Sequence, residues 1–105
     1  MYPVGSSQAV NTPSVKAGDG STAIQILAPN TARRSFSIQN VGTTAAKVCF
    51  GTATTDVFHF VLKGGSADND GLGGSITFNS GYIYNGNITF FGASTAKVVA
   101  FEQAP

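Results

Sequence analysis

The residues that could carry catalysis are few in this chain of 105 residues. His59 is the only histidine and Cys49 the only cysteine, so one chain cannot build a multi-histidine metal site, a cysteine-based zinc site or an internal disulfide. His59 lies between Phe58 and Phe60 in an alternating segment, and no nucleophile motif accompanies it. We therefore expect His59 to be a structural or surface residue, Cys49 to be a small strand or core residue, and the protein not to be an enzyme.

The acidic residues form no convincing catalytic or metal-binding pattern either. Asp68 and Asp70 are close in sequence, but they lie in a glycine-rich stretch from Gly64 to Ser75 that offers nothing to desolvate a carboxyl group, as acid catalysis requires. A calcium loop of the EF-hand type needs a terminal Glu, which this stretch lacks. We expect no metal and no cofactor, and we interpret the stretch as a flexible interaction loop.

Arg33 and Arg34 are the only adjacent basic residues. The net charge is +1 and 10% of residues are charged, which argues against nucleic-acid binding because such proteins concentrate a basic face. Two interpretations of the pair stay open. It is the solvated start of a strand, or it anchors the protein to an acidic partner, since guanidinium groups bind carboxylates well.

These residues must be positioned by β-strands, because Glu and Leu are scarce while Gly, Ser, Thr and Asn are abundant. Apolar and polar residues alternate over short segments, which is typical of half-buried antiparallel strands. The eight segments expected to form strands are Thr22–Leu27, Arg34–Asn40, Ala46–Phe50, Val57–Leu62, Ser75–Phe78, Tyr82–Tyr84, Asn87–Phe91 and Thr95–Glu102.

The turns between these segments indicate the architecture. Asn85-Gly86 is typical of a tight type I′ hairpin, and the strands recur about every ten to twelve residues. We predict an all-β fold, an antiparallel β-sandwich or barrel (jelly-roll-like) of about eight short strands with an extended N-terminal arm. Its expected core is Ile24, Ile26, Phe36, Ile38, Val48, Phe50, Phe58, Phe60, Ile76, Phe78, Ile88, Phe90 and Val98.

The first 21 residues differ from the rest of the chain, because prolines and glycines interrupt any apolar period. We expect an arm over residues 1–21 that forms no regular element, followed by a β-sandwich domain over residues 22–105. A merely disordered terminus is the open alternative. The arm nevertheless carries apolar residues that a solvated tail would not need, so we expect a partner to contact Tyr2, Val4, Val10 and Val15.

Signals for export or membrane insertion are not apparent in the sequence. No run approaches the roughly eighteen apolar residues of a membrane span, and the N-terminus lacks the basic and apolar regions of a secretory signal. We therefore expect the protein to be made in a cytosol and either kept there or assembled from there.

Several segments together resemble those of a known class of protein. They are Ala32–Gly42, Val48–Gly51, Phe60–Gly65, Tyr84–Ile88 and Val98–Glu102. In composition and strand order they resemble small virion structural proteins of tailed bacteriophages, most like head decoration (cement) proteins. The resemblance covers roughly residues 30 to 102 of the chain and leaves the arm unmatched.

This resemblance implies a non-enzymatic protein of the virion that binds and reinforces the capsid. The implied partners are the major capsid protein or other virion proteins, and further copies of this chain in a homo-oligomer, with no role for nucleic acid or membrane. The alternative is a carbohydrate- or receptor-binding β module of a phage tail or fibre. Exposed aromatic residues would serve such a module, and the candidates are Tyr2, Tyr82 and Tyr84.

Overall fold

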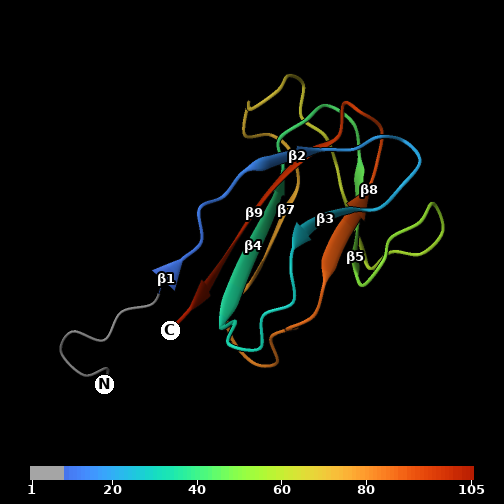
Figure 1. The fold of residues 1–105 in the computed structure, drawn as a ribbon. Helices are drawn as coiled ribbons and strands as arrows, with labels where there is room; N and C mark the ends of the chain where they lie inside the picture. The colour runs from blue at the N-terminus through green and yellow to red at the C-terminus, as the bar shows by residue number, and fades with distance from the viewer. Residues whose placement is uncertain (1–8) are drawn as a thin grey trace.

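The computed structural model describes residues 9–105, and within them the protein is all-β, with nine strands in two antiparallel sheets (Figure 1). The antiparallel β-sandwich expected from the alternating segments is confirmed. The first sheet contains β1 (Ala9–Val10), β2 (Val15–Ala17), β4 (Ser35–Asn40), β7 (Ser75–Phe78) and β9 (Lys97–Ala104). The second sheet contains β3 (Ile24–Leu27), β5 (Ala46–Phe50), β6 (Phe60–Leu62) and β8 (Ile88–Phe91).

The strand order shows how the chain encloses one core. Neighbours in the first sheet follow the order β2-β9-β4-β7, with β1 beside the C-terminal end of β9, and the second sheet follows β3-β8-β5-β6. From β2 onward the chain changes sheet at every connection except the β5–β6 hairpin. This is the strand order of a double-sheet jelly roll, in which one face of each sheet is buried against the other.

Alternate residues of both sheets form the core. Phe36 and Ile38 of β4 share one buried cluster with Val48 of β5 and Phe90 of β8, each at most 1% exposed. All the core residues expected from the sequence, except Phe58, lie in this cluster or pack against it. The inward faces read from the alternation are therefore confirmed for the strands that form.

Phe58 is 40% exposed, so its assignment to the core is wrong. Strand β6 begins at Phe60 rather than Val57, because the preceding polar loop folds back over the outer face of β5. Pairing with β5 resumes where the His59 N–H donates to the Val48 carbonyl oxygen at 2.8 Å. The Phe58 ring lies outside the sandwich, 5.1 Å from the Lys47 ammonium group.

Aromatic rings fill the part of the core around Phe50. Its ring centroid lies 5.8 Å from that of Phe36, 5.7 Å from Phe60, 5.6 Å from Phe78 and 5.0 Å from Tyr84. Such edge-to-face and offset arrangements add to the free energy gained by burial alone. Tyr84 therefore packs against the core, although it belongs to no strand.

The connection from β7 to β8, residues 79–87, is here named the crossover segment. It passes from the first sheet to the second, and neither Asn85 nor Gly86 has the positive φ that a type I′ turn requires. The predicted strand over Tyr82–Tyr84 and the predicted hairpin at Asn85-Gly86 are therefore wrong. A tight hairpin would keep both strands in one sheet, whereas the jelly-roll order places them in different sheets.

The N-terminal arm also differs from expectation. Residues 9–10 and 15–17 form strands β1 and β2, which pair with β9 in the registers Val10↔Gln103 and Val15↔Val99. The expectation that the arm forms no regular element is thus wrong for these residues, because their partner lies at the far end of the chain. The domain boundary at residue 22 stays a prediction.

A buried asparagine fastens the two sheets at the C-terminal end of β4. Asn40 is 0% exposed, and its side-chain amide donates to the carbonyl oxygens of Thr44 at 2.7 Å and Leu62 at 2.9 Å. Its Oδ1 accepts the N–H of Gly42 at 3.0 Å. Because Leu62 lies in β6, these hydrogen bonds tie the first sheet to the edge of the second.

Replacing an inward-facing ring tests this description of the core. Phe90→Ala should lower the free energy of unfolding by roughly 3–5 kcal/mol, because it removes buried area and leaves a cavity. Phe58→Ala, at an exposed position, serves as the control and should lower the free energy of unfolding by about 1 kcal/mol or less. Denaturant unfolding measures both, and equal losses would contradict the assigned faces.

Candidate interaction surface

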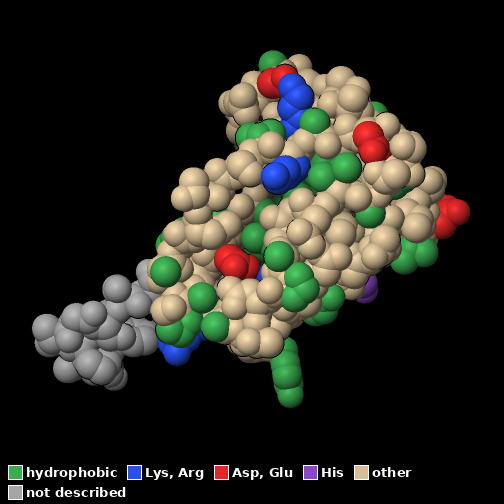
Figure 2. Space-filling model, viewed as in Figure 1, with side chains coloured by type: hydrophobic (Ala, Val, Ile, Leu, Met, Phe, Trp, Pro, Cys, Tyr) green, Lys and Arg blue, Asp and Glu red, His purple; other side chains and the backbone are tan. Residues whose placement is uncertain are grey.

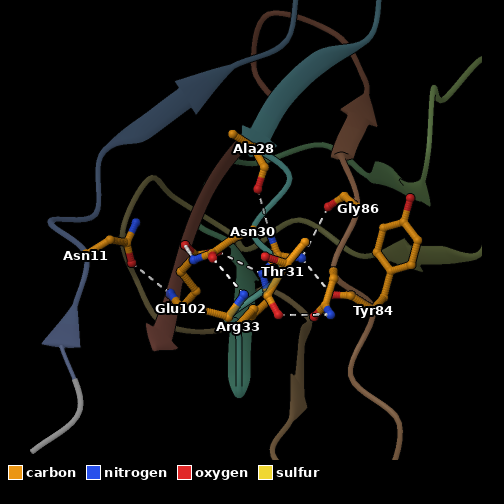
Figure 3. Close-up of polar contacts among 10 residues, drawn as sticks. Asn11, Ala28, Asn30, Thr31, Arg33, Tyr84, Gly86 and Glu102 are labelled. Carbon is orange, nitrogen blue, oxygen red and sulfur yellow. Dashed lines mark hydrogen bonds and ion pairs between the residues drawn. The ribbon is translucent and has the colours of Figure 1, made fainter. Parts of the chain in front are cut away.

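A buried ion pair closes the end of the sandwich where β4 begins (Figure 3). The Arg33 side chain has no exposed surface, and its Nε donates to Oε1 of Glu102 in β9 at 2.8 Å. Its Nη1 donates to the carbonyl oxygens of Tyr84 at 2.6 Å and Gly86 at 3.2 Å, and its Nη2 donates to that of Ala28 at 2.7 Å. One guanidinium group therefore joins β9, the crossover segment and the residues that follow β3.

Two asparagines extend this network. Asn30 donates from Nδ2 to Oε2 of Glu102 at 2.8 Å, so both carboxylate oxygens are engaged. Asn11 in the arm accepts the Glu102 N–H at its Oδ1 at 2.7 Å and donates its own N–H to the Glu102 carbonyl oxygen at 3.3 Å (Figure 3). The residue that neutralises Arg33 thus also holds the arm in place.

The interpretation of Arg33 as a surface residue is wrong, because burial and these hydrogen bonds leave none of its side chain open to a partner. Sequence reasoning also missed Glu102, the only glutamate in the chain. A signal was available, since Glu102 shares the inward face of β9 with Val98 and Ala100. A carboxylate that points inward requires a cation or several donors.

The outer face of the first sheet is open to solvent in the described chain, and we name it the uncovered face. We identify the residues of this face from the cross-strand pairs, because residues directly opposite one another in a sheet point to the same side. Its residues are Val10, Val15, Ala17, Ser35, Ser37, Gln39, Ser75, Thr77, Lys97, Val99, Phe101 and Gln103.

Lys97 is the one charged residue among these strand positions of the uncovered face, and Asp68 pairs with it at 2.6 Å. Val10 and Val15 are each 52% exposed and Phe101 is 39% exposed, which places an apolar stripe along the arm and β9. Strands β4 and β7 add small polar side chains, such as the Ser37 and Thr77 hydroxyls that hydrogen-bond at 2.9 Å. Figure 2, which shows one face of the molecule, presents few charged side chains, with an acidic and a basic group side by side at the top of the view.

The outer face of the second sheet is different, because a loop covers the part of it around Cys49 and Thr89. The Thr89 hydroxyl accepts the Ala53 N–H at 2.9 Å and donates to the Gly51 carbonyl oxygen at 2.7 Å. Lys47 donates from Nζ to the Thr55 carbonyl oxygen at 2.7 Å. Thr89 and its neighbour Cys49 are buried beneath this loop, so the expected placement of Cys49 as a small strand residue is confirmed.

The structure brings two of the four expected arm contacts to the uncovered face. Val10 and Val15 lie on the outermost strands of the first sheet, on either side of Pro13. Proline has no N–H to donate, which is consistent with the break between β1 and β2 at this point. Tyr2 and Val4 lie outside the described residues, and their partner contacts stay a prediction.

Backbone N–H groups of the glycine-rich loop donate hydrogen bonds to an aspartate of the same loop. Asp70 accepts the N–H groups of Leu72 at 2.9 Å, Ala67 at 2.9 Å and Ser66 at 2.8 Å. The amides of Leu72 and Ala67 are the main reason why the pKa of the Asp70 carboxyl group is lowered from its usual 3.8. Asp68 pairs with Lys97 at 2.6 Å. Both carboxylates are therefore engaged within the protein.

The remaining chemistry-bearing residues are dispersed. His59 accepts the Phe50 N–H at Nδ1 at 3.1 Å and stacks on the Phe50 ring, which gives it a structural role. Tyr82 is fully exposed, whereas Tyr84 packs into the core. Among residues 9–105, no three His, Cys, Asp or Glu side chains gather as metal ligands would.

Comparison of the chain with models of known protein families, with curated proteins and with solved structures finds no match. Within the described part of the chain, no helix has the length and apolarity to cross a membrane.

The buried ion pair should dominate the stability of this end of the sandwich. Arg33→Met should lower the free energy of unfolding by roughly 3–5 kcal/mol, because it leaves the Glu102 carboxylate without its cation. The neighbouring Arg34→Met removes the same charge from the surface and should change the free energy of unfolding by about 0.5 kcal/mol or less. Urea unfolding of both variants decides the point, and similar losses would contradict the burial of Arg33.

A second prediction concerns the turn that leads from β2 to β3. The Thr22 hydroxyl and the N–H groups of Ser21 and Thr22 donate to Asp19, and they lower its pKa from 3.8 to about 2. Because the folded-state pKa is depressed, this turn contributes stability above the unfolded pKa and loses it as pH falls through the folded value.

Titration by NMR should place the Asp19 midpoint at about 2 in the wild type. Thr22→Val should raise that midpoint toward 3.8, because the hydroxyl is the largest cause of the shift. An unchanged midpoint in the variant would show that the hydroxyl does not stabilise the carboxylate.

Proposed function

We propose that this protein is a non-enzymatic structural component of a phage virion, a decoration protein that binds the assembled capsid and reinforces it. The sequence supports this proposal through its resemblance to small virion proteins of tailed bacteriophages. The jelly-roll strand order adds support by fold analogy, because capsid and lectin domains use this architecture. The partner would be the major capsid protein or another virion protein, met in the host cytoplasm during assembly.

The uncovered face is the observation that carries the proposal. Its apolar stripe and small hydroxyl side chains are accompanied by one charged residue, Lys97, which Asp68 neutralises, so the face has few of the charges that normally keep sheets apart. A loop covers part of the outer face of the second sheet, whereas among residues 9–105 no such loop covers the strands at the centre of the first sheet's outer face. A sheet face with an apolar stripe and a single, paired charge is better suited to contact with another protein than to exposure to water.

The outermost strands of the first sheet provide a second means of attachment. β1 and β2 pair with β9 on one side, and within the described chain their other edges have no strand partner. An extended segment of a neighbouring protein could add main-chain hydrogen bonds along these edges. Because a capsid repeats each site many times, modest affinity per contact gives high occupancy when the protein is itself a homo-oligomer.

A matched pair of substitutions tests the proposal. Val15 and Val61 are both 52% exposed and both lie in three-residue edge strands, Val15 in the first sheet and Val61 in the second. Val15→Asp should weaken binding to purified heads of the parent phage at least about a hundredfold, since it places a charge in an apolar contact. Val61→Asp should bind as the wild type does.

Cosedimentation with heads measures the affinity, and thermal unfolding of both variants controls for stability. Equal binding by the two variants would remove the uncovered face from the attachment site. Failure of the wild-type protein to sediment with heads would contradict the proposed function itself.

A further inference from the structure

A polar hollow of about 430 Å³ adjoins one end of the uncovered face. It lies where β4 begins and where the crossover segment leaves β7, and its lining includes Arg34, Asn79, Ser80 and Gln103. Its volume is in the range of sites that hold a small molecule or a side chain. It shares Ser35 and Gln103 with the uncovered face, so the two form one continuous surface.

The residues that line the hollow offer several hydrogen-bond donors. Gln103 accepts the Ser35 hydroxyl at Oε1 at 2.7 Å, which leaves its amide nitrogen to donate elsewhere. The Arg34 N–H donates to the Gln103 carbonyl oxygen at 2.8 Å, so the backbones of these two lining residues are held together. The amide of Asn79 and the hydroxyl of Ser80 add further donors.

The charge of the hollow is positive and has no counterion within the described chain. The ion pairs among the described residues are Arg33–Glu102 and Lys97–Asp68, which leave the Arg34 guanidinium without a carboxylate. Arg34 is exposed and is the one charged residue in the lining. A guanidinium group surrounded by neutral donors selects a planar anion that can accept several hydrogen bonds.

We propose that this hollow receives an aspartate or glutamate side chain of the capsid protein that docks on the uncovered face. The inference rests on the proposed function, and continuity of the hollow with the uncovered face favours a protein carboxylate over a free anion. The fully exposed Tyr82 follows Gly81, which lines the hollow with φ at +74°. Tyrosine and arginine are the residue types that most often dominate interface energies, and here they flank one site.

Binding of full-length variants to heads tests the inference. Arg34→Met should weaken binding at least about tenfold. Arg34→Lys should recover only part of that loss, because an ammonium group cannot form the bidentate hydrogen bonds that a guanidinium group makes to a carboxylate. Lys63→Met removes the same charge from an exposed position outside the hollow and the uncovered face and should bind as the wild type does. Equal binding by Arg34→Met and Lys63→Met would overturn the inference while leaving the proposed function in place.

A second measurement does not depend on heads. Amide NMR spectra of the full chain are titrated with a capped peptide containing glutamate and with its glutamine counterpart. We expect shifts at Arg34 and Gln103 with the glutamate peptide alone, and their loss in Arg34→Met. Equal shifts with both peptides would overturn the inference. A uronic-acid oligosaccharide is titrated in the same way, and shifts with this compound alone would also overturn the inference and would instead indicate a carbohydrate site.

Discussion

The pairing of Arg33 with Glu102 is the interaction on which the rest of the structure depends. Burying two charges costs free energy, which is recovered only when hydrogen bonds satisfy the remaining donors and acceptors. Here the guanidinium group also binds three carbonyl oxygens, and the carboxylate also accepts from Asn30. These partners come from segments far apart in the sequence, so the pair forms only when β9, the crossover segment and the start of β4 are in their native places.

The two ends of β4 are thus held by different polar side chains. Arg33 closes one end through an ion pair, and Asn40 closes the other through hydrogen bonds to Thr44 and Leu62. Between these two points the inward residues of β4 lie in the apolar core. A one-residue slip of β4 against its paired strands would turn these side chains outward, so burial favours a single register, and the polar side chains at both ends add to that preference. That register places Val99 and Phe101 outward, where they form the apolar stripe of the uncovered face.

Local patterns in the sequence were sufficient to predict seven of the nine strands that residues 9–105 form and most of the core. Phe36 and Ile38 alternate with serines, and the structure buries both. The errors arose where distant segments decide the outcome. Asn85-Gly86 is a strong hairpin signal, but its flanking strands belong to different sheets, and the arm became regular only because β9 offered an edge.

Arg33 shows that local sequence patterns also failed to predict which residues of the interaction surface are exposed. Its neighbour Arg34 has the same side chain, and nothing in the local pattern distinguishes the buried residue from the exposed one. The difference comes from Glu102, which lies 69 positions away in the sequence. The uncovered face was likewise beyond local reasoning, since it depends on which outer face the loop after β5 covers.

The orientation of the protein on a capsid tests the account most directly. A reconstruction of the intact virion by electron cryomicroscopy would show which side of the sandwich meets the shell. The account predicts that Val15, Val99 and Phe101 lie against the capsid protein, with the outer face of the second sheet turned to solvent. A shell-bound protein whose first sheet faces solvent, or heads that carry no copy of the protein, would contradict it.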